Sequence, residues 1–98
     1  MNDQVMPTDG RAAATATILN KRGLHARAAA KFVKVAGAFE SRITVSKDGQ
    51  SVPGRSIMGL MMLAAATGCT IDIAAEGADA EDAVAAIVRL IDDKFEEE

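Results

Sequence analysis

Apolar and polar residues alternate along three stretches of the chain, and this alternation predicts three β-strands. The stretches are residues 12–19, 40–46 and 70–74, and each contains the β-branched residues that strands favour. A fourth, shorter strand is predicted over residues 50–52, because the preceding Asp48-Gly49 is typical of a tight hairpin turn. The pattern therefore predicts a hairpin formed by residues 40–46 and 50–52. The other two strands, residues 12–19 and 70–74, are separated from it by longer segments of the chain.

Apolar residues spaced three and four apart predict helices between these strands. The first helix covers residues 26–36 and ends before Gly37, a residue typical of the position that follows a helix. The second helix covers residues 57–66, with Ser56 as its N-cap. Within it, the helical spacing directs Leu60 and Leu63 toward the sheet.

A third helix is predicted to begin after Asp79, as its N-cap, and to end near Phe95. Its predicted buried face consists of Ala80, Ala83, Val84, Ile87, Leu90 and Ile91. The resulting order is strand, helix, strand, strand, helix, strand, helix. A single sheet with helices on one face is the simplest arrangement that buries all of these apolar faces.

The chain has 98 residues, of which 49% are hydrophobic, and this predicts one domain with a single core. Residues 1–11 contain Pro7 and Gly10 and no periodicity, so we expect a flexible N-terminal extension followed by a folded domain over residues 12–98. No apolar run is long enough to span a bilayer, and no secretory signal is visible. A cytoplasmic protein without membrane association is therefore expected.

Charge is unevenly distributed along the chain. The formal net charge of −3 argues against nucleic-acid binding. The segment between Asn20 and Ala36 has no acid, and its basic residues are Lys21, Arg22, Arg27, Lys31 and Lys34. A local basic patch on an acidic protein favours a phosphorylated group or an acidic protein partner, so we expect docking to weaken as salt rises.

The only histidine, His25, lies where the first predicted helix begins, within Gly23-Leu24-His25-Ala26-Arg27. At that place the imidazole can carry a group while the free N–H donors of the first helical turn point at it. Arg27 adds a planar cation that suits phosphate oxygens. The combination points to phosphoryl transfer.

Other chemistries find little support in the sequence. A single cysteine, Cys69, excludes an intramolecular disulfide and is expected to act as a small buried hydrophobe. No cluster of metal ligands and no glycine-rich nucleotide loop is visible, so no metal and no cofactor are predicted. One histidine without a convergent pair of acids makes a hydrolase or a metal enzyme a poor interpretation.

Two segments resemble the HPr family, the histidine-containing phosphocarriers of the bacterial phosphoenolpyruvate-dependent phosphotransferase system. Asn20-Lys-Arg-Gly-Leu-His-Ala-Arg27, continued by residues 28–33, resembles the family's active-site segment. Gly54-Arg-Ser-Ile-Met-Gly-Leu60 is similar to its regulatory serine motif, at the family's spacing. The resemblance covers residues 12–95. It implies an α+β open-faced β-sandwich, a four-stranded antiparallel sheet with three helices on one face in the order βαββαβα.

The resemblance also implies a carrier function rather than an enzymatic one. His25 would accept a phosphoryl group, at Nδ1, from phospho-enzyme I and pass it to enzyme IIA domains in sugar transport. Arg27 would accompany it, and backbone N–H groups of Ala26 and Arg27 would stabilise the phosphoryl oxygens. Ala28 stands where the family commonly has proline, a residue that suits a first helical turn, and this change bears on the rate of transfer.

Ser56 has two interpretations. As a plain N-cap it stabilises the helix by about 1 kcal/mol. The resemblance implies that it is a regulatory phosphorylation site of an HPr kinase/phosphorylase, whose product would place negative charge where an acidic partner docks. The predicted docking residues are Ile57, Met58, Met61, Lys34 and Arg22. In the alternative, all six large apolar residues of the second helix lie in the core or are semi-buried.

Two other functions remain open at the level of sequence. The chain could carry phosphoryl groups in a regulatory phosphorelay for nitrogen, carbon or stress responses, without sugar transport. It could also be an interaction module without transfer, although His25 is retained. The enzyme I and the IIA domain that exchange the group with the chain would distinguish these functions. A transiently docking carrier is expected to be a monomer.

Overall fold

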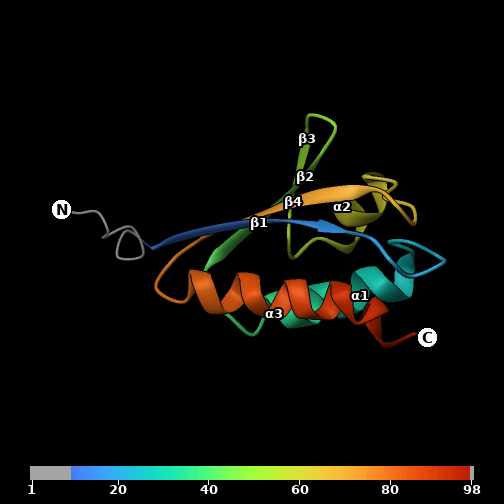
Figure 1. Cartoon of the computed structure of the whole chain (residues 1–98). Helices are drawn as coiled ribbons and strands as arrows, with labels where there is room; N and C mark the ends of the chain where they lie inside the picture. Colours follow the sequence, from blue (N-terminus) through green and yellow to red (C-terminus); the bar gives the residue numbers. More distant parts are fainter. Residues whose placement is uncertain (1–9, 98) are drawn as a thin grey trace.

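Four strands and three α-helices follow one another in the predicted order βαββαβα in the computed structural model, which describes residues 10–97 (Figure 1). The strands are β1 (Arg11–Thr17), β2 (Arg42–Lys47), β3 (Gln50–Pro53) and β4 (Thr70–Glu76). The helices are α1 (Ala26–Ala36), α2 (Ile57–Met62), α3 (Ala80–Asp92) and a final 3-10 turn, η2 (Lys94–Glu96). Strand β1 begins one residue before the predicted domain boundary, and residues 1–9 of the predicted extension lie outside the described residues.

The strands form one antiparallel sheet in the order β1-β4-β2-β3. One face is apolar, and α1 and α3 run side by side along it (Figure 1). The other face is polar: the Thr15 hydroxyl donates to Asp72 at 2.7 Å, and Ser46 and Ser51 hydroxyls pair at 2.8 Å. A sheet that is covered on one face only explains the alternating sequence pattern, and the predicted open-faced β-sandwich is confirmed.

The core between sheet and helices is built from the predicted apolar faces. The buried residues of α3 are the predicted Ala80, Ala83, Val84, Ile87, Leu90 and Ile91. Phe32 of α1 and Phe95 of η2 are fully buried and are the largest side chains in the core. Cys69 is half-buried, so it is less buried than the small buried hydrophobe that the sequence predicts. It packs against the core beside the start of β4.

Helix α1 has the predicted bounds, whereas α2 ends at Met62, earlier than predicted. The left-handed φ of +54° at Ala64 turns the chain out of the helix. This turn brings the buried Ala65 against the loop before α1, where its carbonyl accepts a hydrogen bond from Leu24 N–H at 2.9 Å. Tertiary contact with that loop thus overrides the helical preference of the alanine-rich sequence.

Asp79 is the N-cap residue of α3, as predicted, but its side chain makes no hydrogen bond to the helix. Its carboxylate instead accepts hydrogen bonds from Glu40 N–H at 2.9 Å, Ser41 N–H at 3.0 Å and the Ser41 hydroxyl at 2.5 Å. The hydroxyl of Ser41 is the main cause that lowers the pKa of Asp79. The carboxylate therefore connects the start of α3 to the loop before β2, and three external donors replace the helix N–H groups.

Helix α3 ends at Asp92 rather than near Phe95. Lys94, Phe95 and Glu96 all have positive φ values between 55° and 63°. This left-handed turn reverses the chain and inserts the Phe95 ring into the core. Among the described residues no helix is both long and apolar enough to cross a membrane.

Candidate functional site

His25 is the N-cap residue of α1. Its backbone is extended, with φ −77° and ψ 179°, and its carbonyl accepts the first helical hydrogen bond, from Ala29 N–H at 2.8 Å. The imidazole makes no capping bond to the helix. The N–H groups of the first turn therefore have no partner within the helix and face the region where His25 lies, which is the arrangement that binds anions.

The turn before His25 is held on two sides. Asn20 is fully buried, and its Nδ2 donates to Gly23 O at 2.9 Å. On the other side Leu24 N–H donates to Ala65 O. Gly23 has a φ of +65°, and a Cβ there would lie 2.5 Å from the same Ala65 oxygen. Only glycine fits this turn, which explains why it directly precedes the Leu24-His25 pair.

A carboxylate from the far end of the described chain contacts the histidine ring. His25 Nε2 lies 2.5 Å from Glu97 Oε2, and the two side chains are only 20% and 13% exposed. Glu97 Oε1 accepts a second hydrogen bond, from Asn20 Nδ2 at 3.0 Å. Burial by itself raises the pKa of the Glu97 carboxyl, but hydrogen bonds from Asn20 and His25 outweigh this effect, and the pKa lies below its usual value.

Acidic residues of the C-terminal segment lie beside the predicted basic patch. Four of its residues line one hollow together with two acids of the C-terminal segment: Lys21, Arg22, Arg27, Lys31, Glu96 and Glu97. Lys31 Nζ donates to Phe95 O at 2.7 Å, so part of its hydrogen-bonding capacity is used within the fold. Lys34 contributes to a neighbouring hollow between α1 and α3 that Lys31 also lines. Arg22 and Arg27 are exposed beside His25 in sequence.

Ser56 is the N-cap of α2, as predicted, and its Oγ accepts a hydrogen bond from Gly59 N–H at 2.9 Å. Its side chain is half-buried. The neighbouring Arg55 donates to the carbonyl oxygens of Ala36 and Phe39, just where α1 ends. The serine loop is thereby attached to the helix that begins with His25.

Helix α2 presents an apolar surface to solvent. Leu60 and Leu63 are buried, as predicted. Ile57, Met58 and Met61 are exposed, also as predicted, and Met62, which the sequence analysis did not single out, is 70% exposed. We call these four exposed side chains the α2 apolar patch. Since α2 packs against α1 and leads into the Ala65 contact with Leu24, the patch belongs to the same side of the fold as His25.

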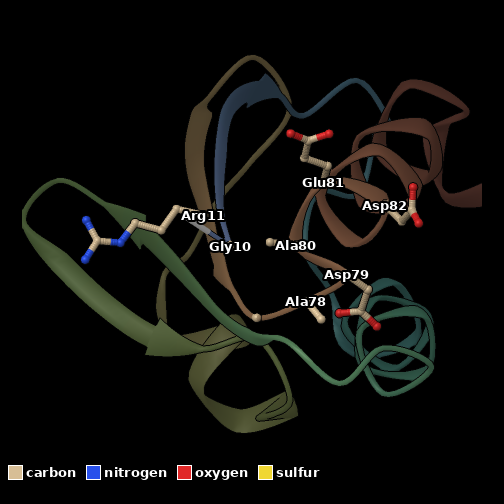
Figure 2. Close-up of a pocket in the computed structure, with 8 residues that line it drawn as sticks. Gly10, Arg11, Ala78, Asp79, Ala80, Glu81 and Asp82 are labelled. Atoms are coloured by element: carbon tan, nitrogen blue, oxygen red, sulfur yellow. The ribbon is translucent and has the colours of Figure 1, made fainter. Parts of the chain in front are cut away.

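A third hollow lies at the start of α3, lined by Gly10, Arg11 and residues 77–82 (Figure 2). Figure 2 shows the side chain of Arg11 directed away from the carboxylates of Glu81 and Asp82. None of the predicted site residues lines it. Its negative charge makes it unsuitable for a phosphorylated group. In the described part of the chain no group of three or more candidate ligands could hold a metal ion.

Sequence reasoning missed Asn20 as a site residue and missed Glu97 altogether. Asn20 belongs to the segment that resembles the family's active site, but the sequence predicts no role for its side chain, and Glu97 belongs to an acidic run that gives no local signal. The His25–Glu97 contact joins residues 72 positions apart, so periodicity and short motifs cannot predict it.

Known proteins match both this sequence and this fold. A family model described as the PTS HPr component phosphorylation site matches residues 12–93. The phosphocarrier protein HPr of Cupriavidus necator is 47% identical over 83% of this chain and 91% of that protein. The crystal structure of HPr-C-His from Thermoanaerobacter tengcongensis aligns with a TM-score of 0.85 and 48% identity, covering 89% of this chain and 98% of that one.

A crystal structure of an HPr dimer from Thermoanaerobacter tengcongensis aligns with a TM-score of 0.70 and 49% identity, over 84% of this chain and 94% of that one. Fold and sequence together define a phosphocarrier of the phosphotransferase system, a carrier rather than an enzyme. The chain belongs to the HPr family.

Proposed function

We propose that His25 accepts a phosphoryl group at Nδ1 from phospho-enzyme I and passes it to enzyme IIA domains. The observation that carries this proposal is the position of the ring at the start of α1, with Nε2 occupied by Glu97. Nδ1 is then the ring nitrogen left for an incoming group. The free N–H donors of the first turn, those of Ala26 and Arg27 in particular, suit the phosphoryl oxygens.

In the transfer, the lone pair of Nδ1 attacks phosphorus as the P–N bond of the donor phosphohistidine breaks. The electrons of that bond return to the donor imidazole. Charge develops mainly on the phosphoryl oxygens, so catalysis rests on position and on nearby positive charge. Arg27 supplies a guanidinium with the geometry to bind two of these oxygens, and Arg22 adds a second cation on the same side.

Partners would dock on the α2 apolar patch together with Arg22 and Lys34. Exposed methionines form a contact surface that adapts to different partners, as a carrier needs when it exchanges donor and acceptor. A transient complex of this kind suits a monomeric carrier formed by residues 12–98, with residues 1–11 as an extension. The dimeric relative makes the oligomeric state a point to measure by light scattering.

We further propose Ser56 as a regulatory site for an HPr kinase/phosphorylase. The hydroxyl lies at the edge of the α2 apolar patch, where a phosphate would add nearly two negative charges. An acidic partner such as enzyme I would be repelled, while α2 and the Arg55 contacts would remain.

A second candidate function is a regulatory phosphorelay that uses the same chemistry at His25 without sugar transport. The serine motif favours the kinase-regulated carrier. The two functions differ in the acceptor: transfer to a sugar-specific IIA domain supports the first, and exclusive transfer to a regulatory IIA domain supports the second.

The test of the carrier function is phosphorylation by enzyme I with radiolabelled phosphoenolpyruvate. Wild type is compared with His25→Ala and with the control Gln50→Ala, which changes an exposed residue of the β2–β3 hairpin. We expect an acid-labile, base-stable label in wild type and control and none in His25→Ala. Label that persists in His25→Ala, or no label in folded wild type, would overturn the proposal.

A further inference from the structure

We propose that Asn20 and Glu97 are positioning residues for the transfer: Asn20 holds the Glu97 carboxylate against His25 Nε2, which keeps the proton on Nε2 and presents an unprotonated Nδ1 to phosphorus. This inference rests on the proposed carrier function and names residues that act through His25. We call the three hydrogen-bonded side chains Asn20, Glu97 and His25 the clamp.

The orientation of the Asn20 amide follows from its neighbours. Its Nδ2 lies 2.9 Å from Gly23 O and 3.0 Å from Glu97 Oε1, and both oxygens are acceptors. Turning the amide over would place Oδ1 against two acceptors, so the orientation with two N–H bonds is the only one that satisfies them. Both amide hydrogens are therefore used to hold one turn and one carboxylate.

This orientation of the Asn20 amide leaves its oxygen buried without a hydrogen bond to any described residue, which destabilises the folded state. Asn20 is fully buried, and its Oδ1 has no hydrogen-bond partner among the described residues. A buried polar atom without a partner destabilises a protein, and such groups in native structures call for an explanation. The explanation we offer is that Asn20 serves the position of Glu97 and not the stability of the core.

Glu97 is held in place by the segment around it. The Phe95 ring is fully buried, Lys31 Nζ binds Phe95 O at 2.7 Å, and Glu97 N–H donates to Lys94 O at 3.0 Å. The left-handed turn of η2 thus directs this segment back to the start of α1. The charged groups that line the hollow around the clamp are Lys21, Arg22, Arg27 and Lys31, with Glu96.

The protonation of the ring follows from the chemistry of its partner. Hydrogen bonds lower the pKa of the Glu97 carboxyl, so near neutral pH the group is ionised and only accepts hydrogen bonds. Nε2 must then be the donor. A neutral imidazole carries one N–H, so its other nitrogen, Nδ1, holds the lone pair that attacks phosphorus.

The same protonation state serves both half-reactions. When Nδ1 accepts the phosphoryl group, the ring becomes cationic, and Nε2–H remains bound to the Glu97 carboxylate. When the P–N bond breaks toward an acceptor, its electron pair returns to Nδ1, and the ring is again neutral with the proton on Nε2. Neither step requires a proton to enter or leave the ring, which suits a carrier that must act reversibly.

The test compares Glu97→Gln with wild type in the full chain, and uses Asp92→Asn as a matched control. Both substitutions remove one negative charge from the C-terminal part of the chain, but Asp92 is exposed at the end of α3 and does not line the hollow around the clamp. Glutamine at 97 can donate to Nε2, which favours the tautomer with the proton on Nδ1. Nitrogen-15 NMR of the His25 ring measures the tautomer, and stopped-flow kinetics with phospho-enzyme I measure transfer.

We expect Glu97→Gln to increase the fraction of ring protonated on Nδ1 and to slow transfer by about tenfold, the scale of effect typical of residues that orient a reacting histidine. Asp92→Asn should change neither quantity. An unchanged tautomer in Glu97→Gln would overturn the proposal, whether or not transfer slows. An altered tautomer with an unchanged transfer rate would overturn it as well.

Asn20→Ala provides a second variant, since it releases Glu97 without altering the carboxylate. As for Glu97→Gln, we expect more of the ring to be protonated on Nδ1 and transfer to be slower. Thermal unfolding is recorded to establish that the variant is folded.

A wild-type protein that takes no phosphoryl group from enzyme I would overturn the carrier function. The NMR comparison does not depend on enzyme I, so it still decides whether the clamp sets the tautomer.

Discussion

At the scale of single residues, the chemistry of the site depends on one histidine whose two nitrogens have different surroundings. Nε2 contacts a carboxylate at 2.5 Å, and the proposed function assigns the phosphoryl group to Nδ1. The motif around His25 is visible in the sequence, since glycine, histidine and arginine occupy adjacent positions. The contacts of Asn20 and Glu97 with the site could not be predicted, because they arise only when the fold brings residue 97 to residue 25.

Arg27→Ala is expected to slow transfer from phospho-enzyme I by about ten- to hundredfold, because the lost guanidinium no longer stabilises charge on the phosphoryl oxygens. Arg27→Lys should retain part of the rate, since lysine keeps the charge without the planar fork. Rapid-quench kinetics measure both. Arg89→Ala, an exposed arginine of α3, is the control and should leave the rate unchanged.

The lowered pKa of Asp79 predicts a pH dependence of stability. The folded state holds this carboxyl ionised below its ordinary pKa of 3.8, so the unfolded state binds more protons there. Its contribution is present above pH 3.8 and is lost as pH falls through the folded pKa. Asp79→Asn should show a smaller decrease in melting temperature over that window than wild type. Equal decreases in the two proteins would contradict this.

At the scale of elements, the turns between them position the site. The bounds of α1 are predictable because Gly37 ends an apolar repeat, whereas α2 stops early because Ala65 must reach Leu24. The exposed residues of α2 follow from helical spacing alone, since a helix this short can bury little more than one side. The reversal after α3 could not be predicted, because positive φ values at three non-glycine residues have no local sequence signal.

Phe95→Ala tests whether the η2 turn anchors the site. Removing a fully buried phenylalanine should lower the free energy of unfolding by about 3–5 kcal/mol, measured by urea denaturation. The half-buried Phe39 is the matched control, and Phe39→Ala should cost less. If the two variants lost equal stability, the anchoring role of Phe95 would be wrong.

Ser56→Asp tests the proposed regulatory role of Ser56. Aspartate can still cap the helix, so the fold should be retained, while its charge should weaken binding of enzyme I several-fold at low salt. Ser51→Asp, on the exposed β3 strand, is the control and should bind as wild type does. Binding measured by isothermal titration calorimetry that is equal for the two variants would contradict a docking role for this end of α2.

At the scale of the whole molecule, one covered sheet explains most of the sequence. Alternating strands need one apolar face, and the three helices supply its cover, so element order and buried faces are predictable. The distribution of charge over the surface is less predictable from the sequence. The basic segment and the acidic C-terminal segment are distinct in the sequence, yet the fold brings them together around His25, and the surface is of mixed charge.

Docking should nevertheless depend on salt. Arg22 and Arg27 remain exposed, and charges of this kind act through fields that fall off within a Debye length of about 10 Å at 0.1 M salt. The kcat/KM for phosphorylation by enzyme I should fall as sodium chloride rises, and Arg22→Gln should reduce that dependence. A kcat/KM that does not vary with salt would contradict electrostatic docking.

The proposed carrier chemistry is tested most directly by the identity of the phosphorylated atom. We would phosphorylate nitrogen-15-labelled protein with enzyme I and phosphoenolpyruvate, and record the phosphorus–nitrogen coupling in the His25 ring by NMR. We predict a bond from phosphorus to Nδ1, with the proton retained on Nε2 against Glu97. A bond to Nε2, or a phosphoryl group at any residue other than His25, would contradict it.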